Sequence, residues 1–246
     1  MKQPIFCTAG ESRALSHAKN LILQWGYNLS PIPSAYVTHL LLPVPSFETI
    51  GILKGGQPLA EVLKNLPENI TIMGSHLEGL PYRTIDFLKD EYYLTENAVI
   101  TAHCTLKLLQ QHYPDILKGI PVAVIGWGRI AKALAPLLVS MGAYVSVAVR
   151  RESQLQSIRQ QHCNGVLLTG WNPEQYEIII NTAPAPVLKQ EQTQAHALLI
   201  DLASQQGIEG DRVLWERGLP NRDAAMSSGT LIAKTALRYA LNKEEV

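Results

Sequence analysis

The stretch PVAVIGWGRIAKALAPLL, residues 121–138, constrains the fold more than any other part of the sequence. Its apolar run VAVIG predicts a buried strand, and the residues after it show the apolar spacing of a helix. Between the two, Gly126, Gly128 and Ala131 form the pattern G-x-G-x-x-A. A strand, a glycine turn and a helix in that order are typical of an α/β domain with a doubly wound parallel sheet, the Rossmann arrangement.

The two glycines and the alanine have separate roles in such a turn. The first glycine makes the tight bend, the second lets the backbone approach a pyrophosphate, and the small third residue lets helix and strand pack closely. The N–H groups at the amino end of the helix attract phosphate. We therefore expect a dinucleotide, with a purely structural turn as the alternative. The predicted contacts at the turn are Gly126, Trp127, Gly128, Arg129 and Ile130.

The end of the next strand, AYVSVAV, bears on the choice between NAD and NADP. An acidic residue there accepts hydrogen bonds from the adenosine ribose and favours NAD. This chain instead has Arg150 and Arg151, with Ser153 close behind. Guanidinium groups bind phosphate in a fork geometry, so the sequence favours NADP over NAD as the cofactor. Solvated surface arginines are the alternative interpretation.

Two further strand ends are candidates for the nicotinamide side. NTAPAP begins at Asn181, and DLAS ends at Ser204. Because open α/β sheets bind ligands at the carboxyl ends of their strands, we expect Asn181, Thr182, Ala183 and Ser204 to contact the cofactor. Alternatively, Asn181 and Thr182 cap a following helix, and Asp201 fixes a loop.

The remaining sequence predicts a second, smaller domain. Before residue 97, apolar runs (PIFCTA, THLLLPV, NITIMG, YYLTEN) alternate with helical patterns at 12–26 and 59–66. The segment NAVITAHCTLKLLQQ predicts an amphipathic helix that joins the domains. The expected layout is an N-terminal α/β domain (1–96), an interdomain helix (97–118), a Rossmann dinucleotide-binding domain (119–225) and a C-terminal helix that packs back towards the first domain (226–246).

Composition excludes several classes of function. Lysine plus arginine and aspartate plus glutamate number 21 each, so no overall charge draws the chain to nucleic acid or to an anionic membrane. No apolar run is long enough to span a bilayer, and the start lacks the pattern of a signal peptide, so we expect a cytoplasmic protein. The three cysteines, odd in number and far apart, favour free thiols over disulfides or a metal site. The expected partners are a small-molecule substrate or another protein, and homo-oligomerisation is left open.

The motifs taken together resemble a known family. ENAVITAHCTLKLL (96–109), VAVIGWGRIAKAL, INTAP, LLIDLAS and GLP (218–220) occur in the order found in the A subunit of dipicolinate synthase. The resemblance implies an NADP-dependent oxidation of a cyclic dicarboxylate, hydroxytetrahydrodipicolinate, to dipicolinate during sporulation. It also implies that the partner is a flavoprotein-like B subunit. By the same comparison, Gly126, Gly128, Arg150, Asn181 and Thr182 match the cofactor side.

Three positions depart from the family pattern. His103 stands where the family has a carboxylate, Gln205 where it has an arginine, and Met226 where a lysine is expected. A dicarboxylate is held best by cations or by well-aimed hydrogen-bond donors, so the loss of two cations weakens such a site. These departures put the substrate in question and leave the glycine turn intact.

The candidate catalytic residues lie on the predicted interdomain helix. Hydride transfer from a substrate carbon requires a base, and histidine titrates closest to neutral pH, so His103 is the candidate, with Thr101 beside it. Asn97 is expected on the substrate side. Ser227 and Ser228 either replace the missing lysine or cap the last helix.

Three functions remain open at this point. The first is an NADP-dependent oxidoreductase similar to the A subunit of dipicolinate synthase. The second is a catalytically silent NADP-binding protein with a regulatory or partner role, which the changes at His103, Gln205 and Met226 favour. The third is an enzyme like the D-2-hydroxyacid dehydrogenases, ranked last because Gln205 stands where they have an arginine.

Overall fold

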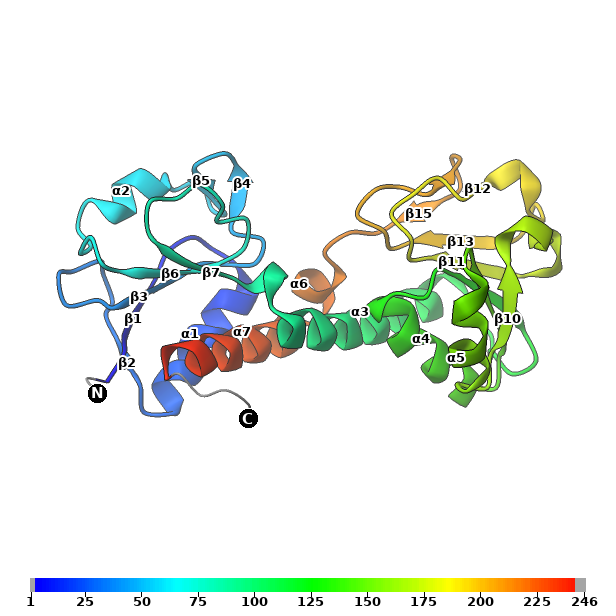
Figure 1. Ribbon diagram of the computed structural model, residues 1–246, viewed down its shortest axis with the longest axis horizontal. Coiled ribbons are helices and arrows are strands. Elements are labelled where there is room, and N and C mark those ends of the chain that lie inside the picture. The colour runs from blue at the N-terminus through cyan, green and yellow to red at the C-terminus, as the bar shows by residue number, and fades with distance from the viewer. Residues whose placement is uncertain (1–2, 242–246) are drawn as a thin grey trace. The chain divides into compact units, whose positions relative to one another are not determined.

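The computed structural model describes residues 3–241. The chain forms two compact units, each with its own sheet (Figure 1). Of the described residues, unit 1 contains those up to Asn97 and those from Pro220 onward, and unit 2 is Ala98–Leu219. Within the described residues, no helix has the length and apolar character needed to cross a bilayer. The same residues include no group of three or more histidine, cysteine or acidic side chains placed to hold a metal ion.

Unit 1 is built on a five-stranded parallel sheet with the order β2-β1-β3-β6-β7. Its strands are β1 (Ile5–Thr8), β2 (Asn28–Leu29), β3 (His39–Leu41), β6 (Thr71–Gly74) and β7 (Arg83–Asp86). An antiparallel pair, β4 (Phe47–Thr49) and β5 (Ile52–Leu53), and the short helix α2 (Leu59–Leu63) lie in the connection between β3 and β6.

Two helices of unit 1 pack closely on each other. Helix α1 (Arg13–Gln24) begins at the N-cap Ser12, whose Oγ accepts a hydrogen bond from the Leu15 N–H (3.0 Å). Helix α7 (Ala225–Ala240) crosses it at Gly229, where a Cβ would lie 2.4 Å from the carbonyl oxygen of Ala14. The absence of a side chain at Gly229 therefore allows this close crossing.

Unit 2 is built on a six-stranded parallel sheet with the order β10-β9-β8-β11-β13-β15. In chain order this is third, second, first, fourth, fifth, sixth, the arrangement of doubly wound dinucleotide-binding folds. The strands are β8 (Pro121–Ile125), β9 (Tyr144–Val149), β10 (Asn164–Leu167), β11 (Ile178–Asn181), β13 (Leu198–Asp201) and β15 (Leu214–Trp215). Helix α4 (Arg129–Ser140) follows β8, and α5 (Leu155–Arg159) follows β9. The predicted α/β class with a doubly wound parallel sheet is confirmed.

The connections around β11 and β13 contain few helical residues. The strands β12 (Leu188–Lys189) and β14 (Ile208–Glu209) pair in parallel, and the remaining helical turns are single 3₁₀ turns. These turns are η3 (Leu168–Gly170), η4 (Pro173–Gln175) and η5 (Gln190–Gln192).

The structure corrects the predicted boundaries of several elements. Helix α3 runs Glu91–His112, so YYLTEN is helical rather than a strand, and the residues from Tyr113 onward lie beyond the helix. Asp90, which precedes α3, accepts a hydrogen bond from the Tyr93 N–H (2.7 Å) and thus caps a helix that apolar content alone made look like a strand. Helix α2 ends at Leu63, earlier than predicted. Pro136 lies inside α4, which nevertheless continues to Ser140.

Candidate functional site

The glycine turn after β8 requires its first glycine for two reasons. Gly126 has φ +95°, a conformation that residues with a Cβ rarely adopt. A Cβ there would also lie 3.0 Å from Thr182 Oγ1 and 3.4 Å from the Ala183 Cβ. The turn between β8 and α4 therefore packs against the loop that follows β11.

The second glycine occupies a different environment. Gly128 is the N-cap of α4 with φ −86°, and it is exposed. A Cβ at this position would meet no atom within 4 Å. Whereas the Ser12 side chain caps α1, α4 has no side-chain cap hydrogen bond. The amino end of α4 thus combines open space with backbone donors that no cap side chain engages, which fits a bound phosphate group.

Thr182 joins the turn to the neighbouring strand. Both its backbone N–H and its Oγ1 donate to the Ile125 carbonyl oxygen, at 3.0 and 2.9 Å. Strands β8 and β11 pair directly, and the chain order reverses between them. Open α/β sheets bind ligands at this switch point, outside the carboxyl ends of the strands. The structure therefore brings Gly126, Thr182 and Ala183 together at that position.

Asn181 has another environment than predicted. Its side chain is fully buried, and Nδ2 donates to the Ala183 carbonyl oxygen and to Asp201 Oδ1, both at 3.0 Å. Its Oδ1 accepts from the Ala183 N–H at 2.9 Å. Both donors of the amide and one lone pair of its oxygen are thus engaged within the protein, and a direct Asn181 contact with nicotinamide stays a prediction. In the structure Asn181 fixes the shape of the loop that carries Thr182 and Ala183.

Asp201 completes this buried network, whose extent the sequence reasoning missed. Its Oδ1 also accepts from the Ala203 N–H (2.9 Å), and its Oδ2 accepts from the N–H groups of Gly207 (2.6 Å) and Ile208 (2.9 Å). A Cβ on Gly207 would lie 2.5 Å from Asn181 Nδ2. One carboxylate therefore holds the loop after β13 in place beside the loop after β11. An aspartate directly at a strand end was the available signal.

The predicted phosphate-binding residues lie on the segment after β9. Arg150, Arg151 and Ser153 are all exposed, and Arg150 Nη2 donates to the Pro186 carbonyl oxygen at 3.4 Å. Arg150 thus reaches from the end of β9 to the loop after β11. Ser204 is exposed in the loop after β13.

The predicted catalytic and substrate residues are distributed over both units. Thr101 is buried and His103 exposed on the part of α3 that belongs to unit 2. His103 lies twelve residues after Glu91, more than three turns into the helix at about 3.6 residues per turn. Asn97, exposed Ser227 and buried Ser228 belong to unit 1. Their catalytic and substrate roles stay predictions.

The capping alternatives are wrong at both places where they were considered. The N-cap of α7 is Ala224, so Ser227 and Ser228 lie inside the first turns of the helix. After β11 the chain forms a loop and then β12 instead of a helix. Pro184 and Pro186 in that loop lack the backbone donors that a helix uses.

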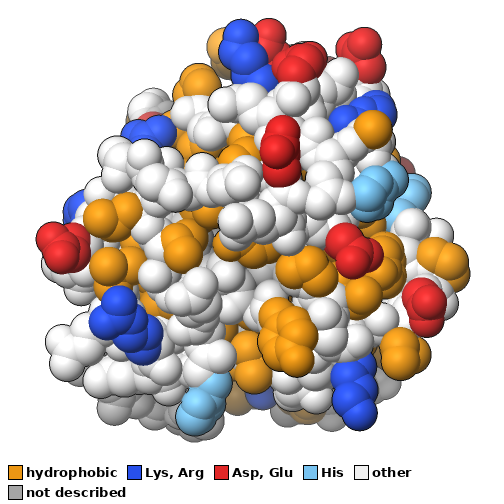
Figure 2. All heavy atoms as spheres, turned by 90° about the vertical axis from the view of Figure 1, so that its right-hand side faces the viewer, with side chains coloured by type: hydrophobic (Ala, Val, Ile, Leu, Met, Phe, Trp, Pro, Cys, Tyr) orange, Lys and Arg blue, Asp and Glu red, His pale blue; other side chains and the backbone are white. Residues whose placement is uncertain are grey.

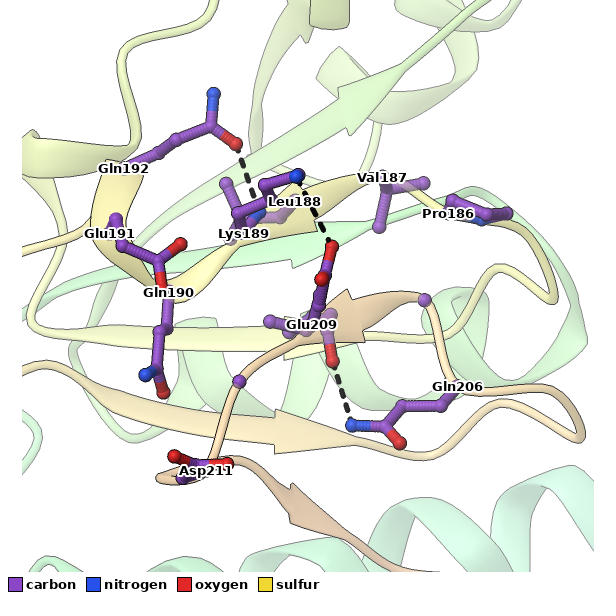
Figure 3. Close-up of a pocket in the computed structure, with 13 residues that line it drawn as sticks. Pro186, Val187, Leu188, Lys189, Gln190, Glu191, Gln192, Gln206, Glu209 and Asp211 are labelled. Atoms are coloured by element: carbon purple, nitrogen blue, oxygen red, sulfur yellow. Dashed lines mark hydrogen bonds and ion pairs between the residues drawn. The ribbon is translucent and has the colours of Figure 1, made fainter.

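Unit 2 also contains a separate pocket with a volume of ≈780 Å³, which is lined by β12, β14 and the residues next to them (Figure 3). Its one lysine, Lys189, pairs with Glu209 (Nζ to Oε2, 3.4 Å), and Glu191 and Asp211 also line it. This excess of acidic side chains disfavours a pyrophosphate. The glycine turn, and not this pocket, is therefore the candidate dinucleotide site.

The surface charge agrees with the composition. Figure 2 shows a face on which basic and acidic side chains are interspersed among apolar ones, without a region of a single sign. Such a face creates no strong field for a polyanion.

The strand order and the glycine turn define unit 2 as a Rossmann-like domain in a two-unit α/β protein. Along most of its length the chain is similar to the A subunit of dipicolinate synthase from Bacillus subtilis (strain 168), with 25% identity over 244 residues, covering 84% of this chain and 78% of that protein. The resemblance that the motifs predict is confirmed. No protein-family model matches the chain.

Solved structures share the fold at low sequence identity. The A subunit of dipicolinate synthase from Bacillus halodurans has a TM-score of 0.85 at 19% identity, covering 99% of this chain and 98% of that one. Its counterpart from Bacillus subtilis gives 0.83 at 18%, covering 99% of both chains. A transhydrogenase from Sinorhizobium meliloti gives 0.73 at 14%, covering 96% of this chain and 92% of that one.

Proposed function

We propose that the chain is an NAD(P)-linked oxidoreductase similar to the A subunit of dipicolinate synthase, which uses NADP to oxidise hydroxytetrahydrodipicolinate to dipicolinate. The observation that carries the proposal is the glycine turn at the switch point, with its open space at Gly128. Similarity to the dipicolinate synthase polypeptide over 84% of the chain supports the reaction class. A B-type partner belongs to the proposal because the relative is itself named as one subunit of a synthase.

In this proposal the residues of unit 2 divide the work of binding. The first-turn N–H groups of α4 bind the pyrophosphate, and Arg150 with Arg151 and Ser153 binds the 2′-phosphate. Asn181 holds the loop that carries Thr182 and Ala183, and these two residues are proposed to lie on the nicotinamide side. When bound, the nicotinamide accepts a hydride from a substrate carbon.

The proposed proton acceptor is the imidazole of His103. A carbon that loses a hydride forms a double bond to its neighbour, which releases a proton to a base. The ring becomes aromatic once the hydroxyl of the substrate has also left as water, so the products are dipicolinate, NADPH, a proton and water. Thr101 is proposed to orient the substrate. Neutral donors of this kind hold a carboxylate more weakly than the arginine and lysine of the family pattern would.

Turnover of freshly generated hydroxytetrahydrodipicolinate with NADP tests the reaction. We expect dipicolinate and NADPH to appear together by absorbance, either with the chain by itself or once a B-type partner has been added. If NADP binds but no turnover is seen in either case, the result would contradict the proposed oxidoreductase activity and favour a catalytically silent NADP-binding protein. The changed residues Gln205 and Met226, both exposed, make that second function a specific alternative.

Replacing Arg150 by alanine tests the choice of cofactor. Because the guanidinium contacts a phosphate that only NADP carries, the Kd for NADP is expected to rise about 10- to 100-fold, the effect of a charge-assisted hydrogen bond, while the Kd for NAD changes little. Calorimetric titration with both cofactors measures this. Equal weakening of both would remove the 2′-phosphate assignment.

A further inference from the structure

Trp127 lies between the two glycines of the turn, and its side chain is 8% exposed. Its indole Nε1 donates a hydrogen bond to Ser157 Oγ at 2.9 Å. Ser157 lies on α5, thirty residues along the chain. The G-x-G-x-x-A pattern requires no particular residue at this position, so the hydrogen-bonded tryptophan is not explained by the glycine turn itself.

Ser157 also forms a hydrogen bond with the segment that follows β9. Ser157 Oγ donates to the Gln154 carbonyl oxygen at 2.9 Å, and a hydroxyl both donates and accepts. The Gln154 N–H in turn donates to the Arg151 carbonyl oxygen at 3.1 Å. Three consecutive hydrogen bonds therefore connect the glycine turn with the segment that carries Arg150 and Arg151.

The segment is also fixed on its other side. Arg150 Nη2 donates to the Pro186 carbonyl oxygen at 3.4 Å. The side chains of Arg151 and Ser153 themselves are exposed. Their placement therefore depends on how firmly the backbone beneath them is held, and Trp127 with Ser157 supplies one attachment of that backbone.

We propose that Trp127, acting through Ser157, is a positioning residue that sets the preference for a 2′-phosphorylated dinucleotide. This inference rests on the proposed function. The pyrophosphate is common to NAD and NADP, whereas the 2′-phosphate belongs to NADP alone. Loosening the segment from Arg150 to Gln154 thus weakens NADP binding selectively, because arginines that must be ordered on binding lose affinity.

A merely structural role of Trp127 has a different signature. A tryptophan that only fills space under the turn would, when changed, weaken both cofactors equally or lower the melting temperature. The indole N–H is separable from the ring, because phenylalanine keeps an aromatic ring and removes the donor. The ratio of the two dissociation constants is therefore the informative quantity.

The test compares Trp127→Phe and Ser157→Ala with the wild type by calorimetric titration with NADP and NAD. Both variants are expected to lower the ratio of Kd for NAD to Kd for NADP by about three- to tenfold, the effect of one lost hydrogen bond, with the Kd for NAD nearly unchanged. Ser157→Thr, which keeps a hydroxyl, is expected to restore the ratio.

Trp171 offers a matched control in the same unit. Its indole Nε1 is buried and has no hydrogen-bond partner within the described residues. Trp171→Phe is expected to keep the wild-type ratio. Unchanged ratios in Trp127→Phe and Ser157→Ala, or equal weakening of both cofactors, would overturn the inference.

The wild type separates this inference from the proposed function. A wild type that binds neither dinucleotide contradicts the proposed function. A wild type that prefers NADP, with variants that keep that preference, contradicts only the role of Trp127. Ser157 is exposed on a short helix, so its alanine variant keeps the test valid even if Trp127→Phe fails to fold.

Discussion

Replacing Gly128 by aspartate is expected to abolish dinucleotide binding while leaving the stability of the fold unchanged or higher. The position has φ −86° and open space for a Cβ, so the backbone tolerates a side chain. Aspartate is a preferred N-cap, and its charge stabilises the amino end of a helix. The same carboxylate occupies the approach of the pyrophosphate and repels it. The Kd for NADP should rise at least about 100-fold.

Two comparison variants separate charge, size and backbone strain at the turn. Gly128→Asn caps the helix without a charge and should weaken binding less than Gly128→Asp. Gly126→Ala forces a Cβ onto φ +95° and towards Thr182, so it should lose binding and also lower the melting temperature by several degrees, because such strain costs about 1–2 kcal/mol. Calorimetry and thermal melts measure both effects. Tight NADP binding by Gly128→Asp would show that the phosphates lie elsewhere.

The glycine turn could be predicted from the sequence because its requirements are local. Positive φ at Gly126, close packing at Ala131 and an uncapped helix start are all set by residues a few positions apart. The parallel sheet followed from the alternation of apolar runs with helical patterns for the same reason. Local patterns therefore sufficed for the fold class and for the position of the candidate site.

The role of Asn181 could not be read in this way. Its partner Asp201 is twenty residues away, and the two meet only because β11 and β13 are neighbours in the sheet. The Trp127–Ser157 contact likewise depends on how α5 packs. The segment YYLTEN forms a helix although its apolar content predicts a strand, because the helix is fixed by a cap at Asp90 and by packing rather than by amphipathic spacing. Contacts between residues this far apart in the sequence depend on which elements are neighbours in the fold, and the sequence motifs do not specify that.

Asp90→Asn is expected to destabilise unit 1 by about 2–4 kcal/mol, because it breaks a largely buried ion pair and leaves a cation without its partner. The Asp90 side chain is 6% exposed and accepts hydrogen bonds from the Arg238 guanidinium, the Tyr239 hydroxyl (2.6 Å) and the Tyr93 N–H. It thereby joins the last turn of α7 to the start of α3. Thermal and urea unfolding of the variant measure the loss, with the exposed Asp211→Asn as a control.

The pH dependence of stability provides an independent check on the contacts of Asp90. Burial acts to raise the pKa of Asp90, but the hydrogen bonds from Tyr239, Tyr93 and Arg238 outweigh it and hold the pKa below its usual range. The unfolded chain therefore takes up the proton first as the solution is acidified. The stabilisation is complete above the unfolded pKa of about 3.9 and is lost as the pH falls through the folded pKa. Between about pH 5 and pH 3, wild-type stability should fall more steeply than that of Asp90→Asn; parallel profiles would mean that the carboxylate contributes nothing to joining α7 and α3.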